Sequence, residues 1–285
     1  NTGTNTITFK ETSLANTYDP KGRVQLVKVR SYSEARVSSV LICAPWDSVY
    51  GKGGVLALMV RRKLVLNADI DVSGKGFKGG IAAMSPGDCQ VVATSFNFYD
   101  ASSTASGFKG EGIGNKCNNN ITTTDIYPGN AKGKAPSFSG GGGGNGHYSG
   151  GGGGSNYGAA YQYDLLGNRV SGGSEIAGCD FLGGAYGGNS ITDNVNINDG
   201  VFMGGGGGAS TFATTPAVRS DGGNGGGIIF IVADTLVGNS KNIYANGAAS
   251  NATVTGNAGS GGGGGGGSVI IQASTIITPP AIYAK

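Results

Sequence analysis

Residues 261–277 read GGGGGGGSVIIQASTII, so a run of seven glycines passes directly into an apolar segment rich in β-branched residues. The same junction occurs twice more, as GGIIFIV at 226–232 and as GGVLALMV at 53–60. Apolar, β-branched runs that are bounded by glycine or proline are typical of β-strands. The three junctions therefore predict three strands, each entered from a glycine-rich segment.

Each of these strands is followed, after a short break, by a second and shorter apolar run. Ile70, Ile243 and Ile282 occupy equivalent places in the three second runs. Units that repeat in this way and cannot bury their apolar faces alone are typical of stacked architectures. We expect an all-β fold of stacked strand layers, either β-helix-like or a sandwich. No stretch has a convincing 3.6-residue apolar period, so almost no α-helix is expected.

The N-terminal part is expected to add further strands. Residues 23–30 and 36–43 are both rich in Val and Leu, and each predicts a strand. Residues 5–10 alternate between polar and apolar types, which is typical of an edge strand.

Glycine supplies 58 of the 285 residues, against a usual share of about 7%. It is concentrated in tracts at 140–144, 150–154, 204–208 and 261–267. Such tracts either stay flexible or adopt the extended left-handed helix with three residues per turn. Without side chains, neighbouring helices of this kind approach closely and hydrogen-bond to each other. Because the tracts are tied to expected strand layers, we predict an inserted polyglycine-II helix bundle, with flexible loops as the alternative.

The chain divides into three parts that are expected to form one continuous unit. Residues 1–80 are a basic β part, residues 81–220 a glycine-rich insert with Tyr-rich loops, and residues 221–285 the C-terminal β repeats with their glycine tract. Residues 1–80 carry 12 Lys or Arg and 6 Asp or Glu, whereas residues 81–285 carry 8 and 11. Opposite charges on the two parts favour head-to-tail attraction between copies, although two solvated surfaces would give the same counts.

Several chemical functions are disfavoured. The G-x-G-x-x-G pattern at 74–79 is not followed by a stretch that could form the helix of a dinucleotide site. His147 is the single histidine, so no two-His metal site is available. Charged residues make up 13% of the chain, about half the usual share, and no convergent acid–base set is visible. We therefore expect neither an enzyme nor a nucleic-acid-binding protein.

Two weaker patterns concern cysteine and calcium. The even cysteine count allows disulfides, with Cys89–Cys117 as the first candidate pair, other pairings open, and free thiols as the alternative. Asp193, Asn196 and Asp199 offer oxygen ligands in one loop, but the closing Glu of an EF-hand is missing. This loop is a weak calcium candidate, and no other cofactor is expected.

Tyrosines are concentrated in the insert. Exposed tyrosine supplies stiff, amphipathic contact area in binding loops. The alternative is that these rings seal the glycine bundle. The candidate contact residues are Tyr148, Tyr157, Tyr161, Tyr163 and Tyr186.

The stretches at 44–47, 53–58, 64–67 and 74–80 resemble glycine-rich bacterial surface proteins of the adhesin and gliding-associated type. The stretches at 184–187 and 242–247 share this resemblance. It implies a secreted, surface-exposed protein with a polyglycine-II helix bundle. The predicted bundle is also similar in architecture to that of phage tail-tip adhesins. Neither resemblance carries catalytic residues to this chain.

These observations predict a non-enzymatic, extracellular structural or adhesive protein that assembles head-to-tail with itself into a filament or surface layer. The third repeat stops at Lys285, which suggests a fragment or a layer completed by another copy. The alternatives are an adhesin that binds a receptor or glycan, including the tail-tip type, and, less favoured, an ice-binding protein. No apolar run reaches 18 residues, and the chain opens without Met, so we expect a secreted form whose signal peptide was removed.

Overall fold

The computed structural model describes residues 25–84, 106–113, 131–145, 149–159, 162–163, 169–170, 184–192, 200–212, 219–251 and 259–285. Strands account for all the regular structure in these residues and no helix occurs, which confirms the all-β expectation for this part of the chain. None of these residues belongs to a helix that is long and apolar enough to cross a membrane. The strands are β1 Arg30–Val37, β2 Val55–Leu66, β3 Ile70–Asp71, β4 Ala83–Met84, β5 Gln162–Tyr163, β6 Arg169–Val170, β7 Thr211–Phe212, β8 Ile228–Val237, β9 Asn242–Tyr244, β10 Ser268–Ile277 and β11 Ala281–Tyr283.

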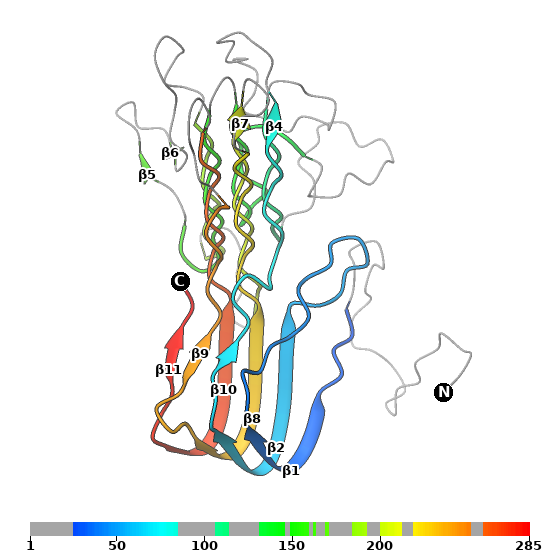
Figure 1. The fold of residues 1–285 in the computed structure, drawn as a ribbon, viewed down its shortest axis with the longest axis vertical. Coiled ribbons are helices and arrows are strands. Elements are labelled where there is room, and N and C mark those ends of the chain that lie inside the picture. Colours follow the sequence, from blue (N-terminus) through cyan, green and yellow to red (C-terminus); the bar gives the residue numbers. More distant parts are fainter. Residues whose placement is uncertain are drawn as a thin grey trace, which may run out of the picture.

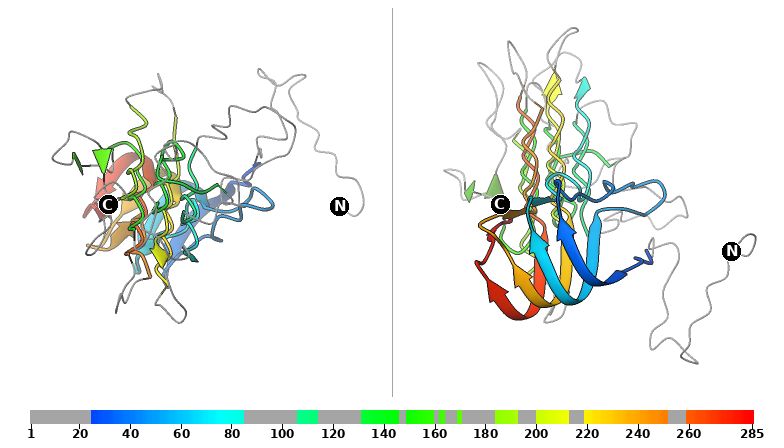
Figure 2. Two further views of the ribbon diagram at one scale, coloured as in Figure 1. Left: turned by 90° about the horizontal axis from the view of Figure 1, so that it is seen from above. Right: turned by 60° about the horizontal axis from the view of Figure 1, so that its bottom comes forward.

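Four strand–turn–strand units lie side by side at one end of the molecule. The first strands of the four units form a parallel sheet in the order β1-β2-β8-β10. The second strands of three of them form a parallel sheet in the order β3-β9-β11, and the remaining unit adds a single parallel bridge from Leu41 to Ile70 in β3. We call them unit 1 (β1 and Leu41), unit 2 (β2 and β3), unit 3 (β8 and β9) and unit 4 (β10 and β11). Figure 2 shows their four bends in a row. Neighbours in this row are therefore also neighbours in chain order.

The register confirms the predicted equivalence of three isoleucines. Ile243 pairs with Ile70 on one side and with Ile282 on the other. Leu41 forms a parallel bridge with Ile70 and so occupies the same position in unit 1. The sequence pattern had revealed units 2, 3 and 4 but not unit 1.

The two strands expected at 23–30 and 36–43 are wrong over the described residues. The strand runs instead over Arg30–Val37, and residues 25–29 and 38–43 contain no strand apart from the Leu41 bridge. The segment RSYSEARV is mostly polar and exposed, so the burial of its side chains does not explain why it forms a strand. Its backbone pairing with β2 explains it, because the backbone N–H and C=O groups along that side of β2 require hydrogen-bond partners. The edge strand expected at 5–10 lies outside the described residues.

The hydrophobic core lies between the first and second strands of the units. In β8 the residues alternate, so that Ile229 and Ile231 are buried while Phe230 and Val232 are partly exposed. This period of two is what a strand with one face on the core requires. The core also draws on both strands of unit 2 and on β9. Its buried members are Val37, Leu58, Val60, Leu64, Leu66, Ile70, Val72, Ile229, Ile231, Ala233, Leu236, Ile243 and Ala245.

Glycine-rich segments extend from the strand units as long, twisting chains that lie side by side, with β4 and β7 at their far end (Figure 1). Residues 204–209 lie at the centre of this group, and their backbone N–H groups donate with a three-residue period. The donor–acceptor distances are between 2.7 and 2.9 Å. Gly204 and Gly207 donate to Gly226 and Gly223, Gly205 and Gly208 to Ser155 and Gly152, and Gly206 and Ala209 to Glu111 and Phe108.

The carbonyl groups of residues 204–209 follow the same period. They accept from three further segments, again with partners spaced three residues apart, at 2.8–3.2 Å. Phe77 and Gly80 donate to Gly204 and Gly207, Gly265 and Gly262 to Gly205 and Gly208, and Gly141 and Gly144 to Gly206 and Ala209. The central segment is thus hydrogen-bonded to six surrounding segments, and it contacts each of them once in every three residues.

Close approach, rather than backbone freedom, explains the glycines of this central segment. None of residues 204–208 has a positive φ. A Cβ on Gly206 would lie 1.9 Å from the carbonyl oxygen of Lys78, and a Cβ on Gly208 would lie 1.8 Å from that of Gly142. Such a contact cannot exist, so only glycine allows the segments to be this close.

A polar contact links the strand units to the glycine-rich segments. The Trp46 indole Nε1–H donates to Glu111 Oε2 at 2.9 Å, and the backbone N–H of Lys78 donates to the same oxygen at 3.0 Å. Glu111 is almost fully buried, and Trp46 packs edge-on against Phe77 with ring centroids 5.8 Å apart. The buried carboxylate therefore joins three segments that are distant in sequence.

Candidate assembly interface

The row of strand units has two open ends. Unit 4 ends it on one side with β10 and β11, and unit 1 ends it on the other with β1 and Leu41. Within the described residues, none of these four elements has a strand on its outer side. An uncovered strand edge presents a row of backbone N–H and C=O groups that can template further pairing.

At the unit 4 end, the hydrophobic core is open. Leu236 is fully buried in β8, whereas Ile276, its register partner in β10, is 49% exposed. Ile243 is fully buried in β9, whereas its partner Ile282 is 51% exposed. Side chains at the same positions of neighbouring units therefore differ in exposure, and within the described residues no further strand lies beside unit 4.

Terminal units of stacked proteins usually carry polar outer faces that keep the core away from water. Unit 4 carries no charged residue in its strands, since β10 reads SVIIQASTII and β11 reads AIY. Ile276, Ile277 and Ile282 are about half exposed, beside the exposed polar residues Gln272, Ser274 and Thr275 of β10, so this end combines uncharged side chains with an open backbone edge.

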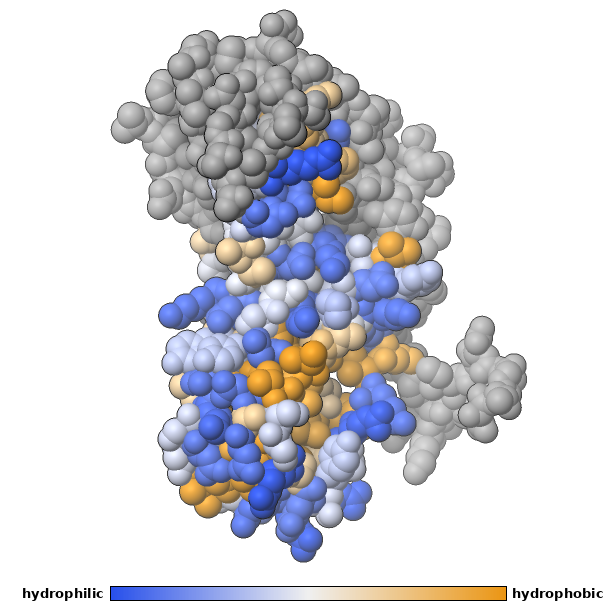
Figure 3. Space-filling model, in the orientation of Figure 1, coloured by the Kyte–Doolittle hydropathy of each residue, from blue (hydrophilic) through white to orange (hydrophobic). Residues whose placement is uncertain are grey.

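The unit 1 end also exposes apolar side chains. Tyr32 is 43% exposed although its register partner Val60 is 1% exposed. Apolar residues on both flanks of β1 are exposed as well: Leu26, Val27, Val29, Val40 and Ile42. Figure 3 shows hydrophobic residues gathered over the strand units on the face that it draws.

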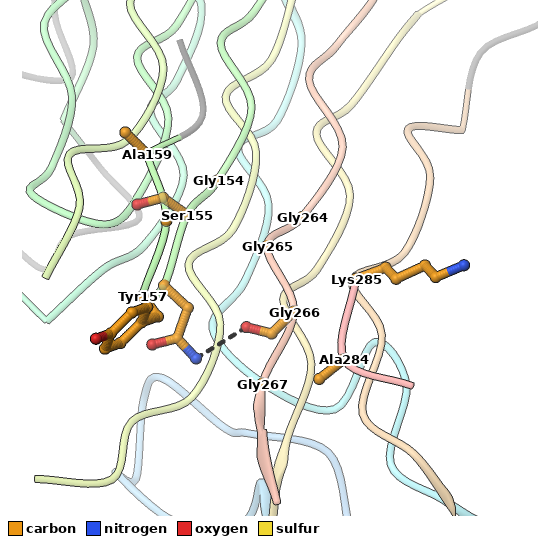
Figure 4. A pocket seen from close by; sticks show the side chains of 12 residues that line it. Gly154, Ser155, Tyr157, Ala159, Gly264, Gly265, Gly266, Gly267, Ala284 and Lys285 are labelled. Atoms are coloured by element: carbon orange, nitrogen blue, oxygen red, sulfur yellow. Dashed lines mark hydrogen bonds between the residues drawn. The ribbon is translucent and has the colours of Figure 1, made fainter. Parts of the chain in front are cut away.

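A cavity of about 300 Å³ opens beside unit 4, where the chain enters β10 and leaves β11. Its walls are residues 154–159, residues 264–267, Ala284 and Lys285. The Asn156 side chain donates through Nδ2 to the carbonyl oxygen of Gly266 at 3.0 Å and fixes one wall to another. In Figure 4 the side chains of Tyr157 and Lys285 lie on opposite sides and point away from each other.

The structure locates two of the five candidate tyrosine side chains and does not show them as one surface. Tyr157 is 78% exposed at the cavity. Tyr186 is half-buried among the glycine-rich segments, where its ring lies 5.3 Å from the Lys134 ammonium group and its carbonyl accepts from Gly142. Tyr163 lies in β5, opposite Arg169, but its side chain is outside the described part, as are Tyr148 and Tyr161.

The remaining predicted sites lie outside the described residues. These are the cysteine pair Cys89–Cys117 and the calcium candidates Asp193, Asn196 and Asp199. Within the described ranges, no group of three or more His, Cys, Asp or Glu side chains is placed to hold a metal ion.

Two titratable groups near the strand units have shifted pKa values. Burial raises the pKa of the free Cys43 thiol, and the positive charge of Lys75 and a backbone hydrogen bond oppose this shift. Desolvation raises the pKa of Tyr244, and Asp69, Tyr283 and Asp71 raise it further. Tyr244 and Tyr283 stack at 5.2 Å, as their register predicts.

Sequence reasoning missed the side chains that form the two open ends. Ile276 and Ile282 were recognised as strand residues, but their exposure depends on which unit ends the row. Tyr32 was not assigned to a strand at all. No family model, curated protein or solved structure was found that matches this chain.

Proposed function

We propose that this chain is a non-enzymatic, extracellular structural and adhesive protein that assembles head-to-tail by continuing its row of strand units from one copy to the next. Unit 1 of one copy adds beside unit 4 of another. The observation that carries the proposal is the half-exposure of Ile276 and Ile282 at positions that are fully buried one unit away. A new unit at this end would bury both.

The two ends match when the internal register is continued. By the pairings within the chain, Ala35 of the next copy falls beside Ile276, and Tyr32 falls beside Ala273. A small residue then meets a large one at both positions. Leu41 falls beside Ile282, as it falls beside Ile70 in its own copy. Alternation of large and small residues favours close packing of facing layers.

The direction of pairing favours a filament over a closed dimer. Every contact within the row is parallel, and its two ends are different surfaces. A contact between different surfaces of identical copies is heterologous, and it propagates into an open fibre unless the rotation closes a ring.

The glycine-rich segments are proposed to form a polyglycine-II helix bundle that stands on the strand layers. The three-residue period of hydrogen bonds around residues 204–209 supports this assignment, because the extended left-handed helix has three residues per turn. A bundle that uses every backbone group in this way is a rigid support, and it leaves few side chains for chemistry.

Light scattering and negative-stain electron microscopy of the concentrated protein test the assembly. The wild-type chain is expected to form fibres. Ile276→Lys is expected to abolish them while circular dichroism stays unchanged, because it places a charge on the half-exposed end. Ile81→Lys is the matched control, since Ile81 is 59% exposed but follows the glycine-rich stretch after unit 2. A wild-type protein that stays monomeric would contradict the proposal.

Mixing two blocked variants tests the head-to-tail geometry. Ile276→Lys blocks one end and Tyr32→Lys blocks the other, so each variant alone is expected to be monomeric. Mixed together, the two intact ends are expected to join into a heterodimer that does not grow. Homodimers of either variant alone would indicate a symmetric contact and would contradict head-to-tail assembly.

A second candidate function, binding of a receptor or glycan, is favoured by Tyr157. Its side chain is 78% exposed and stands at the mouth of a cavity with polar walls. Tyr157→Ala is expected to reduce binding to cells or to a glycan array. Unchanged binding would count against this candidate.

A further inference from the structure

One backbone contact recurs between successive strand units. The residue just before the first strand of a unit donates its N–H to a carbonyl that follows the second strand of the previous unit. It occurs three times, at 2.7–2.9 Å, and joins each pair of neighbouring units. The pairs are Gly54 to Ala44, Gly227 to Val72 and Gly267 to Ala245.

Unit 4 carries a carbonyl that continues this series. The carbonyls of Tyr283 and Lys285 accept from Ala245 and Gly247 of the preceding unit. Because successive carbonyls of an extended chain point to opposite sides, the carbonyl of Ala284 between them points away from unit 3. Ala284 lines the cavity described above, and no donor to its carbonyl is found within the described residues.

The matching donor belongs to the other end of the row. The β1–β2 register pairs Arg30 with Leu58, so four residues earlier Leu26 is equivalent to Gly54. Leu26 is 62% exposed. Its neighbour Gln25 is fixed in position, because the Gln25 side chain donates to the Gly53 carbonyl at 3.2 Å and accepts from the Gly53 N–H. The segment before β1 is therefore already ordered next to unit 2.

We infer that the cavity beside unit 4 receives residues 25–27 of a second copy, whose Leu26 N–H donates to the carbonyl of Ala284. The inference rests on the proposed head-to-tail assembly and names a contact that sets its register.

Photo-cross-linking in assembled fibres tests this contact. A benzophenone amino acid replaces Leu26 in copies of natural isotope content, and these are mixed with isotope-labelled wild-type copies. Mass spectrometry is expected to find cross-links between the light position 26 and heavy residues 264–267 or 284–285. Fibres whose cross-links fall elsewhere would overturn this inference and leave the proposed function standing. Absence of fibres in the wild-type protein would overturn both.

A proline substitution gives an independent measure. Leu26→Pro removes the donor and is expected to raise the critical concentration for assembly about tenfold, which corresponds to one backbone hydrogen bond. Leu26→Met keeps the N–H and a similar side-chain volume, and it is expected to change that concentration less than threefold. Trp46 fluorescence verifies that both variants fold. Equal critical concentrations for Leu26→Pro and wild type would contradict the contact.

Discussion

The strand units and the glycine-rich segments are held together in opposite ways. In the strand units, side chains such as Leu236 and Ile243 are fully buried, and the core depends on removing apolar area from water. Around residues 204–209 the segments are held by backbone hydrogen bonds to six neighbours, and side chains are absent where the chains are closest. The strand units are stabilised by buried side chains, and the glycine-rich segments by close backbone hydrogen bonds that the absence of side chains permits.

This difference implies that the two regions tolerate opposite substitutions. A smaller residue damages the strand units by leaving a cavity. A larger residue damages the glycine-rich segments, because the atom that it would meet is a backbone carbonyl that cannot rotate away. Single-residue substitutions at matched positions in the two regions measure this contrast as changes in the free energy of unfolding.

The largest effect is expected for Gly206→Val. A Cβ at Gly206 would lie 1.9 Å from the carbonyl oxygen of Lys78, so the neighbouring segments must separate. We expect the free energy of unfolding to fall by about 4 kcal/mol, at the upper end of single-residue effects. Thermal or urea unfolding measures it.

Gly263→Ala is the control within the glycine-rich segments. Gly263 lies in a seven-glycine tract, but a Cβ there would meet no heavy atom closer than 3.7 Å, and its φ is not positive. The variant is expected to be as stable as the wild type or slightly more stable, since alanine reduces the freedom of the unfolded chain. Equal melting temperatures for Gly206→Val and Gly263→Ala would contradict the close packing.

An intermediate effect is expected for Leu236→Ala in the strand units. Leu236 is fully buried, so the variant should lose about 3 kcal/mol of unfolding free energy. Ile276→Ala, at the register partner that is 49% exposed, should lose about 1 kcal/mol in the monomer. The two variants should become more alike in assembled fibres. Identical losses in the monomer would show that unit 4 is covered.

The smallest effect concerns the Cys43 thiol. Burial raises its pKa, so its alkylation by iodoacetamide at pH 8 should be slower than that of an exposed cysteine, because less thiolate is present. Lys75→Met removes the charge that lowers this pKa, and a further slowing of about twofold is expected. Mass spectrometry of the peptide that contains Cys43 measures the rate. Lys63→Met is the matched control, and a slowing there would contradict the assigned cause.

The sequence predicted the strands whose apolar, β-branched side chains are packed against the hydrophobic core. The β-branched runs after Gly227 and Gly267 are strands because their alternating side chains have a core to enter. The equivalence of Ile70, Ile243 and Ile282 followed from the same logic. β1 lies at Arg30–Val37 and not at the two predicted positions, because the segment RSYSEARV is held extended by its backbone pairing with β2. A polar edge strand of this kind has no apolar pattern from which it could be predicted.

The glycine-rich segments were visible only where glycine is continuous. The segment around Gly80 donates hydrogen bonds to the central segment, and the segment around Gly110 accepts them from it. Neither is a continuous glycine tract, and the second contains Phe108, Lys109 and Glu111. A contact made once in three residues requires glycine only at the positions of closest approach, so a G-x-x-G spacing was the signal that could have found them. An open layer at the third repeat was expected from the sequence, but the exposure of Ile276 was not, because it depends on which unit ends the row.

Amide hydrogen exchange tests most directly whether the glycine-rich segments are ordered by their own backbone. The account predicts that the amides of Gly204, Gly206 and Gly208 are protected as strongly as those of β8, because each donates to a neighbouring segment at 2.7–2.9 Å. Gly158, which has no atom near its missing side chain, should exchange rapidly and serves as the internal reference. Exchange of residues 204–208 at the rate of Gly158 would contradict the account.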